Sequence, residues 1–169
     1  LQCTNDVVGL WNFDEGGGSF VGDGSRFRNN GMLIPIQVAP WSTGCQFGGC
    51  VWLNGTTQFI DIPDSPQLNF GDGINDKPFT FSAWVKRASI NTTDVIFSKY
   101  YTFNATDRSQ YWFRAGADGR LDIHIVSGNG DYRKGIKTQD QLLNNTNCHH
   151  VAATYDGSIT VSGLAFYVD

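Results

Sequence analysis

The stretch FTFSAWVK at residues 79–86 decides the fold, because apolar and polar side chains alternate along its length. Successive side chains of a β-strand point to opposite faces, so this alternation is typical of a strand with one face in a core. The odd-numbered positions carry the apolar side chains Phe79, Phe81, Ala83 and Val85. We therefore predict a strand over residues 79–86 whose odd-numbered side chains face inward.

The same alternation recurs elsewhere in the chain. It predicts further core-facing rows at Tyr111 and Phe113, at Leu121, Ile123 and Ile125, and at Val151 and Ala153. In the first third, Asn54-Gly55 separates the apolar runs 51–53 and 59–62, and Asn-Gly between extended runs predicts a hairpin. The glycine- and asparagine-rich segment 14–31 is predicted to be loop. Short apolar runs among 20 glycines therefore indicate an all-β fold.

The positions that alternate with the predicted core-facing residues carry aromatic and charged side chains. It contains Trp84 and Lys86, Phe97 and Lys99, Trp112 and Arg114, and Asp122 and His124. If the strands are neighbours in one sheet, these residues form a second row on its other face.

Length and charge limit the functions that we expect. A chain of 169 residues with 40% hydrophobic residues has the size of one domain, which we predict to span residues 1–169. The net charge of −4 offers no basic stripe, so nucleic acid and anionic membrane surfaces are not expected partners. No apolar run approaches the roughly 20 residues of a membrane-spanning helix. Since a signal segment is not recognised at the start, we expect a portion of a longer protein.

Four cysteines and four Asn-x-Thr sequons favour an extracellular or cell-surface location. We predict a bridge between Cys45 and Cys50, which Gly48 and Gly49 allow to fold back, and a second one between Cys3 and Cys148. The second bridge would join the N-terminal strand to the strand that begins near residue 148. The predicted glycosylation sites are Asn54, Asn91, Asn104 and Asn144, although an Asn- and Thr-rich chain also produces such triplets by chance.

Six segments occur in a recognisable order and spacing. They read GLWNFDEGGGS, NNGML, FGGCVWLNGTTQFIDIPDSPQLNF, FTFSAWVKR, CHHVAATYDGS and AFYVD. Together they resemble the laminin-G-like (concanavalin-A-like) jelly-roll domains that are widespread in microbial surface proteins. The match covers nearly the whole chain, with one departure: the family usually has Trp where Cys148 stands.

The resemblance implies two antiparallel sheets packed face to face, a β-sandwich of the jelly-roll kind. In similar domains, the strand that resembles LAFYVD at residues 164–169 is followed by further strands. We therefore expect that the protein continues beyond Asp169, or that a neighbouring chain supplies the strand.

Sugar recognition needs an aromatic ring against the apolar side of a pyranose and polar groups for its hydroxyls. On one predicted face this mixture is supplied by Trp84, Lys99, Trp112, Arg114 and His124. The alternative is that Trp84 and Trp112 are half-buried under a loop, as tryptophan often is. Tyr100, Tyr101 and Tyr132 are alternative contacts.

Calcium is the expected cofactor, because many domains similar to this one hold a structural calcium ion. Calcium binds several oxygen ligands from loops, and the predicted ligands are Asp14, Asp23, Asn30 and Asp64. The alternative is that these residues make turns through hydrogen bonds from side chain to backbone.

We expect no enzymatic activity. The glycosidases of this sandwich need paired carboxylates, whereas no strand here carries closely spaced acids and the one glutamate, Glu15, lies in the glycine-rich loop. We predict an extracellular carbohydrate-binding or adhesion module of a larger surface protein, with glycans or glycoproteins as partners. The alternatives are a structural subunit of a surface appendage that self-associates and, more weakly, a glycoside hydrolase.

Overall fold

The computed structural model describes residues 6–36, 41–44, 46–70, 76–99, 102–103, 106–107, 111–126, 133–158 and 160–169. They form two compact units, residues 1–68 and 69–169, and each unit is described by itself. All described strand pairings are antiparallel, which confirms the all-β prediction. The prediction of one domain over residues 1–169 stays a prediction.

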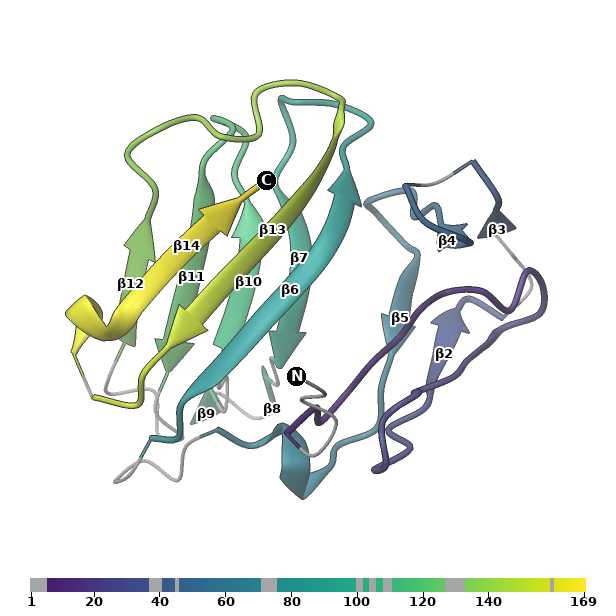
Figure 1. The fold of residues 1–169 in the computed structure, drawn as a ribbon, viewed down its shortest axis with the longest axis horizontal. Helices are drawn as coiled ribbons and strands as arrows, with labels where there is room; N and C mark the ends of the chain where they lie inside the picture. Colours follow the sequence, from purple (N-terminus) through teal and green to yellow (C-terminus); the bar gives the residue numbers. More distant parts are fainter. Residues whose placement is uncertain are drawn as a thin grey trace. The chain divides into compact units, whose positions relative to one another are not determined.

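The larger unit, residues 69–169, is built from two sheets (Figure 1). The first has the order β12-β11-β10-β7 and contains β7 (Asp94–Lys99), β10 (Tyr111–Ala115), β11 (Leu121–Val126) and β12 (Arg133–Lys137). The second has the order β14-β13-β6 and contains β6 (Phe79–Lys86), β13 (Cys148–Tyr155) and β14 (Leu164–Val168). The remaining elements are the paired strands β8 (Thr102–Phe103) and β9 (Thr106–Asp107) and the 3-10 turn η2 (Val161–Gly163).

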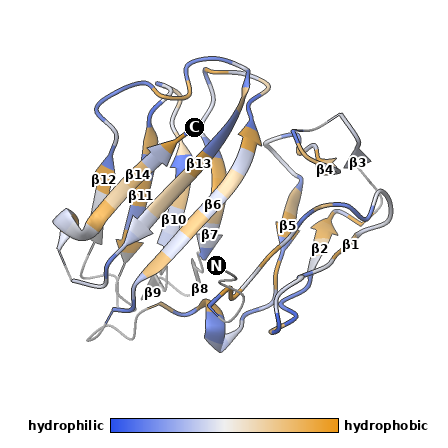
Figure 2. Cartoon of the chain, viewed as in Figure 1, coloured by the Kyte–Doolittle hydropathy of each residue, from blue (hydrophilic) through white to orange (hydrophobic). Residues whose placement is uncertain are grey.

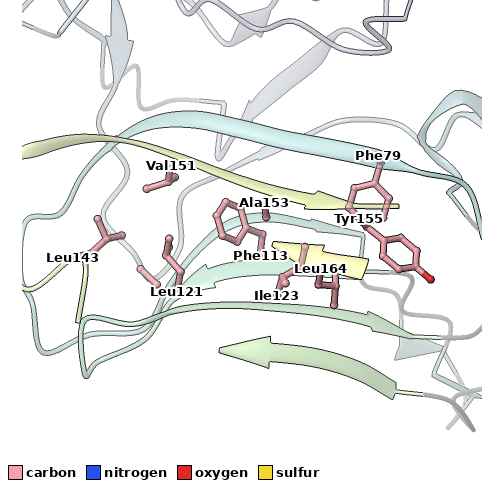
Figure 3. Packing of buried hydrophobic residues seen from close by; sticks show 10 residues of the cluster. Phe79, Phe113, Leu121, Ile123, Leu143, Val151, Ala153, Tyr155 and Leu164 are labelled. Atoms are coloured by element: carbon pink, nitrogen blue, oxygen red, sulfur yellow. The ribbon is translucent and has the colours of Figure 1, made fainter. Parts of the chain in front are cut away.

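The core lies between these two sheets. Phe113, Leu121, Ile123, Val151 and Ala153 are almost completely buried there, and Figure 3 shows them pointing toward one another from opposite layers. An aromatic cluster continues the core, with ring centroids of Phe79 and Phe81 4.7 Å apart. The predicted core rows and the β-sandwich are therefore confirmed.

One predicted row is wrong on β7. Phe97 was expected on the outer face, but its ring stacks on that of Phe81 in the core with a centroid distance of 5.4 Å. The register explains the difference, because Phe97 pairs with the buried Phe113 and Lys99 with the buried Tyr111. A register shift between Phe113 and Arg114 then brings Val95 opposite Arg114, so parity alone does not predict the faces of β7.

A buried arginine fixes the connection after β6. Arg87 donates hydrogen bonds from Nε to Asp94 Oδ2 at 2.9 Å, from Nη1 to the Leu143 carbonyl at 3.1 Å and from Nη2 to the Thr92 carbonyl at 2.5 Å. Its charge is thus paired and hydrogen-bonded, as burial of an arginine requires.

The smaller unit, residues 1–68, contains a sheet of order β1-β2-β5, formed by β1 (Phe20–Val21), β2 (Gly31–Ile34) and β5 (Phe59–Asp61). It also contains the paired strands β3 (Trp41–Ser42) and β4 (Cys50–Val51) and the 3-10 turn η1 (Pro66–Leu68). Val21 and Leu33 are buried, whereas Phe20, Met32 and Phe59 are exposed. Figure 2 shows the apolar colouring of β2 and β5.

The predicted hairpin at Asn54-Gly55 is wrong in its pairing. The turn itself is present, since Gly55 has φ +70° and Asn54 Oδ1 accepts the backbone N–H groups of residues 56, 57 and 58. The flanking strands, however, pair elsewhere, β4 with β3 and β5 with β2. In its own sheet β14 pairs with β13, and whether further strands follow Asp169 stays a prediction.

The core predicts a strong dependence on Phe113. We expect Phe113→Ala to lower the free energy of unfolding by about 3–5 kcal/mol, because it removes a fully buried ring and leaves a cavity. Tyr167→Ala is the matched control, since Tyr167 is 59% exposed on β14 and its loss should cost far less. Urea unfolding of both variants measures the difference, and equal losses would contradict this account of the core.

Candidate functional site

An aromatic row crosses the outer face of the four-stranded sheet. The register places Trp112 of β10 between Ser98 of β7 and His124 of β11, and His124 in turn opposite Gly135 of β12. Cross-strand partners point to the same face, so these residues lie side by side on the side of the sheet away from the core.

The rings of Trp112 and His124 stack against each other. Their centroids are 4.5 Å apart and their planes are inclined by 15°. Gly135 makes room for this arrangement, because a Cβ there would come within 2.7 Å of the imidazole. His124 thus stacks on the indole from β11, and on the β7 side the cross-strand partner of Trp112 is the exposed Ser98.

Asp122 holds the polar groups of this face in place. Its side chain is largely buried, and Oδ2 accepts hydrogen bonds from Arg114 Nε at 2.9 Å and Nη2 at 2.7 Å. His124 Nε2 lies 2.7 Å from the other carboxylate oxygen. Arg114 Cζ also lies 5.9 Å from the ring centroid of Trp112. One buried carboxylate thus fixes both Arg114 and His124 beside the indole.

A polar depression of about 330 Å³ adjoins the aromatic row. Its lining consists of Thr93, Arg114, Gly116, Ala117, Asp118, Asp122 and Lys137. Lys137 Nζ donates a hydrogen bond to Asp118 Oδ2 at 2.5 Å, and Arg120 Nη1 lies 3.8 Å from the same oxygen. The hydrogen bond from Lys137 lowers the pKa of the Asp118 carboxyl below its ordinary value. Asp118 is therefore an anion paired with a cation at neutral pH.

The structure brings together three of the five predicted sugar-binding residues, Trp112, Arg114 and His124. Trp84 lies on β6 of the other sheet, where its ring centroid is 5.3 Å from that of His150. Lys99 pairs with the buried Tyr111, and its ammonium donates a hydrogen bond to Asn69. The prediction that all five share one face is therefore wrong. Trp84 is excluded because β6 and β10 belong to different sheets, and Lys99 is excluded because it pairs with Tyr111, whose side chain faces the core.

Sequence reasoning left Asp118, Lys137, Gly135 and Ser98 out of the site. Asp122 was placed on the outer row but given no role. The alternation along β11 places Asp122 on the outer face. Lys137 becomes the neighbour of Asp122 only through the pairing of β12 with β11, which the sequence does not indicate. The alternative contacts Tyr100, Tyr101 and Tyr132 lie outside the described residues.

Asp23, a predicted calcium ligand, organises the loop of the smaller unit. Its Oδ1 accepts the backbone N–H groups of Leu10 and Ser25 at 2.8 and 2.7 Å. Its Oδ2 accepts the Ser25 hydroxyl at 2.7 Å and the Asn29 N–H at 2.8 Å. A carboxylate has about four lone-pair sites, so these four donors occupy Asp23 fully. Asp23 does not fit the role of a calcium ligand in this arrangement.

The other predicted ligands also make turn contacts. Asn30 Oδ1 accepts the Asp23 N–H at 2.9 Å, and Asp14 Oδ1 accepts the Gly49 N–H at 2.6 Å. Asp64 lies in the loop between β5 and η1. Within the described part of the chain, no three His, Cys, Asp or Glu side chains gather as a metal site. Calcium binding stays a prediction, and these contacts agree with the alternative that the residues build turns.

One predicted disulfide is wrong in this structure, because Cys148 is a free thiol. Cys148 begins β13, which pairs with β6 on one side and β14 on the other. Cys50 is disulfide-bonded. Its predicted partner Cys45 and also Cys3 lie outside the described residues, so the Cys45–Cys50 pairing stays a prediction.

The sequons have different surroundings. Asn54, Asn91 and Asn144 are all exposed, and Asn54 also uses its amide group in the turn, with Nδ2 donating to Thr57 Oγ1 at 2.9 Å. Asn104 lies outside the described residues. Glycosylation at these four positions stays a prediction.

Comparisons with known proteins agree with the sandwich. The family model described as the concanavalin A-like lectin/glucanases superfamily matches residues 54–169. A solved structure of an S-layer domain-containing protein (residues 221–444) from Clostridium thermocellum is 21% identical, with a TM-score of 0.57 over 95% of this chain and 67% of that one. At this identity the likeness concerns the fold alone. No curated protein matches the chain. No helix among the described residues is long and apolar enough to cross a membrane.

The contacts of Asp23 predict a loss of stability in Asp23→Asn. We expect the free energy of unfolding to fall by about 2–3 kcal/mol, because an amide nitrogen would replace a charged acceptor facing the Asn29 N–H. If Asp23 instead bound calcium, the loss would appear in calcium and vanish in excess chelator. Thermal melting in both solutions distinguishes the cases, with Asp61→Asn, an exposed carboxyl of the same unit, as the control.

The same carboxylate predicts a pH dependence. Burial raises the pKa of Asp23, but the hydrogen bonds from Ser25, Leu10 and Asn29 outweigh burial, so the pKa lies below its ordinary value. The stabilisation is therefore complete above the unfolded pKa of about 3.9 and is lost as the pH falls through the lower folded value. Unfolding measured between neutral and acidic pH should show this loss in the native chain and a flatter profile in Asp23→Asn.

Proposed function

The chain belongs to the concanavalin A-like lectin/glucanase superfamily, and on this basis we propose that it is an extracellular carbohydrate-binding or adhesion module of a larger surface protein. The observation that supports this most strongly is the outer face of the four-stranded sheet. There, an indole that stacks on a histidine lies beside an arginine and a polar depression.

The chemistry of this face suits a pyranose. The indole of Trp112 supplies an aromatic ring of the kind that packs on the C–H side of a sugar, and its neighbour on β7 is the small, exposed Ser98. Arg114 supplies N–H donors, and Asp118 supplies a carboxylate acceptor for hydroxyl groups. A few placed polar groups around an aromatic platform are typical of small-ligand sites.

The face is also pre-organised for binding. Asp122 fixes Arg114 through two hydrogen bonds and lies against His124, and His124 in turn supports the indole of Trp112. Side chains that are held before the ligand arrives lose less conformational freedom on binding. The network therefore favours a binding role for these residues.

We propose that this face binds sugar without cleaving it. Glycoside hydrolysis uses a carboxylic acid with a raised pKa as the proton donor, opposite a second carboxylate. Here Asp122 is buried beneath Arg114 and His124, and the pKa of Asp118 is lowered by Lys137. Neither carboxylate of the depression has the environment of a general acid.

An extracellular or cell-surface location is part of the same proposal. Cys50 is disulfide-bonded, and disulfides persist in oxidising compartments. The exposed sequons at Asn91 and Asn144 are accessible for glycosylation in a host that carries it out.

A second candidate is a structural subunit of a surface assembly. One observation favours it: Phe20, Met32 and Phe59 are exposed on the β1-β2-β5 sheet, and their side chains share one face by register. An exposed apolar sheet face is typical of contact surfaces between proteins. This function predicts self-association that rises with protein concentration, together with no binding to any sugar.

We expect Trp112→Ala to reduce sugar binding at least tenfold, because the contact between the indole and the C–H face of the sugar is lost. A glycan array identifies the bound sugar, and calorimetry with the native chain and the variant measures the change. Ser98→Trp should also reduce binding, since it places a large side chain at the cross-strand position beside Trp112.

Trp84→Ala is the matched variant, because Trp84 is a partly exposed tryptophan on the opposite sheet. If Trp84→Ala removes binding and Trp112→Ala retains it, the outer face of the four-stranded sheet is not the site. A blank array combined with sedimentation that shows concentration-dependent assembly would favour the structural function instead.

A further inference from the structure

The imidazole of His149 joins three segments at one end of the larger unit. His149 is the second residue of β13, and its side chain is only 13% exposed. Its Nδ1 lies 2.6 Å from Oδ2 of Asp169, the residue that follows β14. Its Nε2 lies 3.0 Å from Oδ1 of Asn145, which belongs to the connection between β12 and β13. Both ring nitrogens of His149 therefore face oxygen atoms.

The contact at Nε2 requires the ring to donate. Asn145 Oδ1 also accepts the backbone N–H of Asn147 at 2.8 Å. This second hydrogen bond assigns the orientation of the Asn145 amide group, because an amide nitrogen in the same place could not accept a hydrogen. Since an oxygen faces Nε2 of His149, that ring nitrogen carries a hydrogen.

The contact at Nδ1 also requires the ring to donate. The second carboxylate oxygen of Asp169, Oδ1, accepts the backbone N–H of His150 at 3.0 Å. The hydrogen bond from His149, together with that from the His150 N–H, lowers the pKa of the Asp169 carboxyl below its ordinary value. Asp169 is therefore ionised and can only accept. Both nitrogens of an imidazole donate only in its protonated, positively charged form.

The titratable neighbours of His149 along β13 point the other way. His149 shares the inward positions of β13, whereas alternation places Cys148 and His150 on the outer face of the sheet. The register agrees, because these two residues pair with Lys86 and Trp84 of β6. The ring of His150 lies against that of Trp84, with 5.3 Å between the centroids. The three titratable side chains of the outer face are thus separated from His149 by the sheet.

On its own side of the sheet, His149 lies opposite an apolar residue. Its cross-strand partner on β6 is Val85. Arg87, which follows β6, directs its guanidinium at Asp94, so these two charges are paired with each other. The carboxylate in contact with the imidazole is that of Asp169. The charge of His149 is therefore balanced by Asp169.

We infer that His149 is a proton-dependent clasp that fastens the connection between β12 and β13 to the end of β14. With two ring hydrogens, the imidazole bonds to Asn145 and Asp169 together. After loss of one proton, the remaining hydrogen stays at Nδ1, where it faces a carboxylate. A lone pair at Nε2 then faces the lone pairs of Asn145 Oδ1, so the contact with Asn145 is lost and the contact with Asp169 remains.

The segment that the clasp releases is defined by its other anchors. Leu143 is buried, its N–H donates to the Gly119 carbonyl, and its own carbonyl accepts from Arg87. These contacts contain no histidine, so Leu143 should stay in place when His149 loses a proton. Histidine in water loses this proton near about pH 6.5. We expect residues 144–147 to become more mobile as the pH rises through neutrality, while Leu143 and β14 stay ordered.

Nitrogen-15 NMR of the histidine rings in the whole chain tests the protonation states directly. Between about pH 5 and 8 we expect His149 to change from two ring hydrogens to one, which stays at Nδ1. Hydrogen exchange of the amides at 144–147 should lose about five- to tenfold of its protection over the same range, once the intrinsic rise of exchange with pH is corrected. A ring that carries one hydrogen throughout, or a protection that does not follow the titration of His149, would overturn the inference.

Asn145→Ala removes the acceptor at Nε2 and leaves the contact with Asp169. In this variant the protection of residues 146 and 147 should be low at every pH and should no longer change with the titration of His149. His150→Gln is the matched control, since it removes the neighbouring histidine from the outer face, and there the pH dependence should persist. If His150→Gln abolishes the pH dependence and Asn145→Ala retains it, the clasp is not at His149. If Asn145→Ala does not fold, the ring hydrogens of the native chain still decide the question.

The clasp is independent of the proposed function. It uses no residue of the outer face of the four-stranded sheet, so a blank glycan array leaves it standing. Conversely, if His149 shows no coupled titration, the proposal of sugar binding is unaffected.

Discussion

The structure of the larger unit depends on a layer of side chains buried between its two sheets. Phe113 and Ile123 come from one sheet and Val151 and Ala153 from the other, and all four are almost completely excluded from water. Because strand side chains alternate, burying this row forces the intervening residues of β10 and β11 onto the outer face. The position of Trp112, Asp122 and His124 in one patch is thus a consequence of core packing.

The polar chemistry of that patch depends on one buried carboxylate. A buried charge is stable when it is paired and hydrogen-bonded, and Asp122 Oδ2 accepts two hydrogen bonds from the Arg114 guanidinium, while His124 Nε2 lies 2.7 Å from Oδ1. The pairing has a second effect, since it holds the Arg114 and His124 side chains beside the indole. In the smaller unit Asp23 has a corresponding role, because its four hydrogen bonds hold the segment between β1 and β2. One aspartate thus organises the candidate site on the four-stranded sheet, and the other organises a loop of the smaller unit.

Sequence patterns predicted the strands with the clearest alternation. The strand 79–86 has the predicted bounds, and the core rows of β10, β11 and β13 face inward as expected. The prediction failed on β7, where a register shift changes which side chains face the core. It also failed at Asn54-Gly55, where the predicted turn is present but the strands on its two sides pair with other strands. Alternation reports the two faces of a strand, but it does not report the neighbour of that strand.

The fold class, the inward residues of the long strands and the residue types of the candidate site follow from local sequence patterns. The tertiary structure decided which of those residues meet. It separated Trp84 from Trp112 by assigning β6 and β10 to different sheets, and it brought Lys137 and Gly135 to Asp122 and His124 through the pairing of β12 with β11. It also buried Arg87. The hydrogen-bond partners of Arg87 lie 5, 7 and 56 residues away in the sequence, at positions 92, 94 and 143, and no repeating pattern connects them. The physical reason is that periodicity is a local property of the chain, whereas pairing and burial are set by contacts between distant segments.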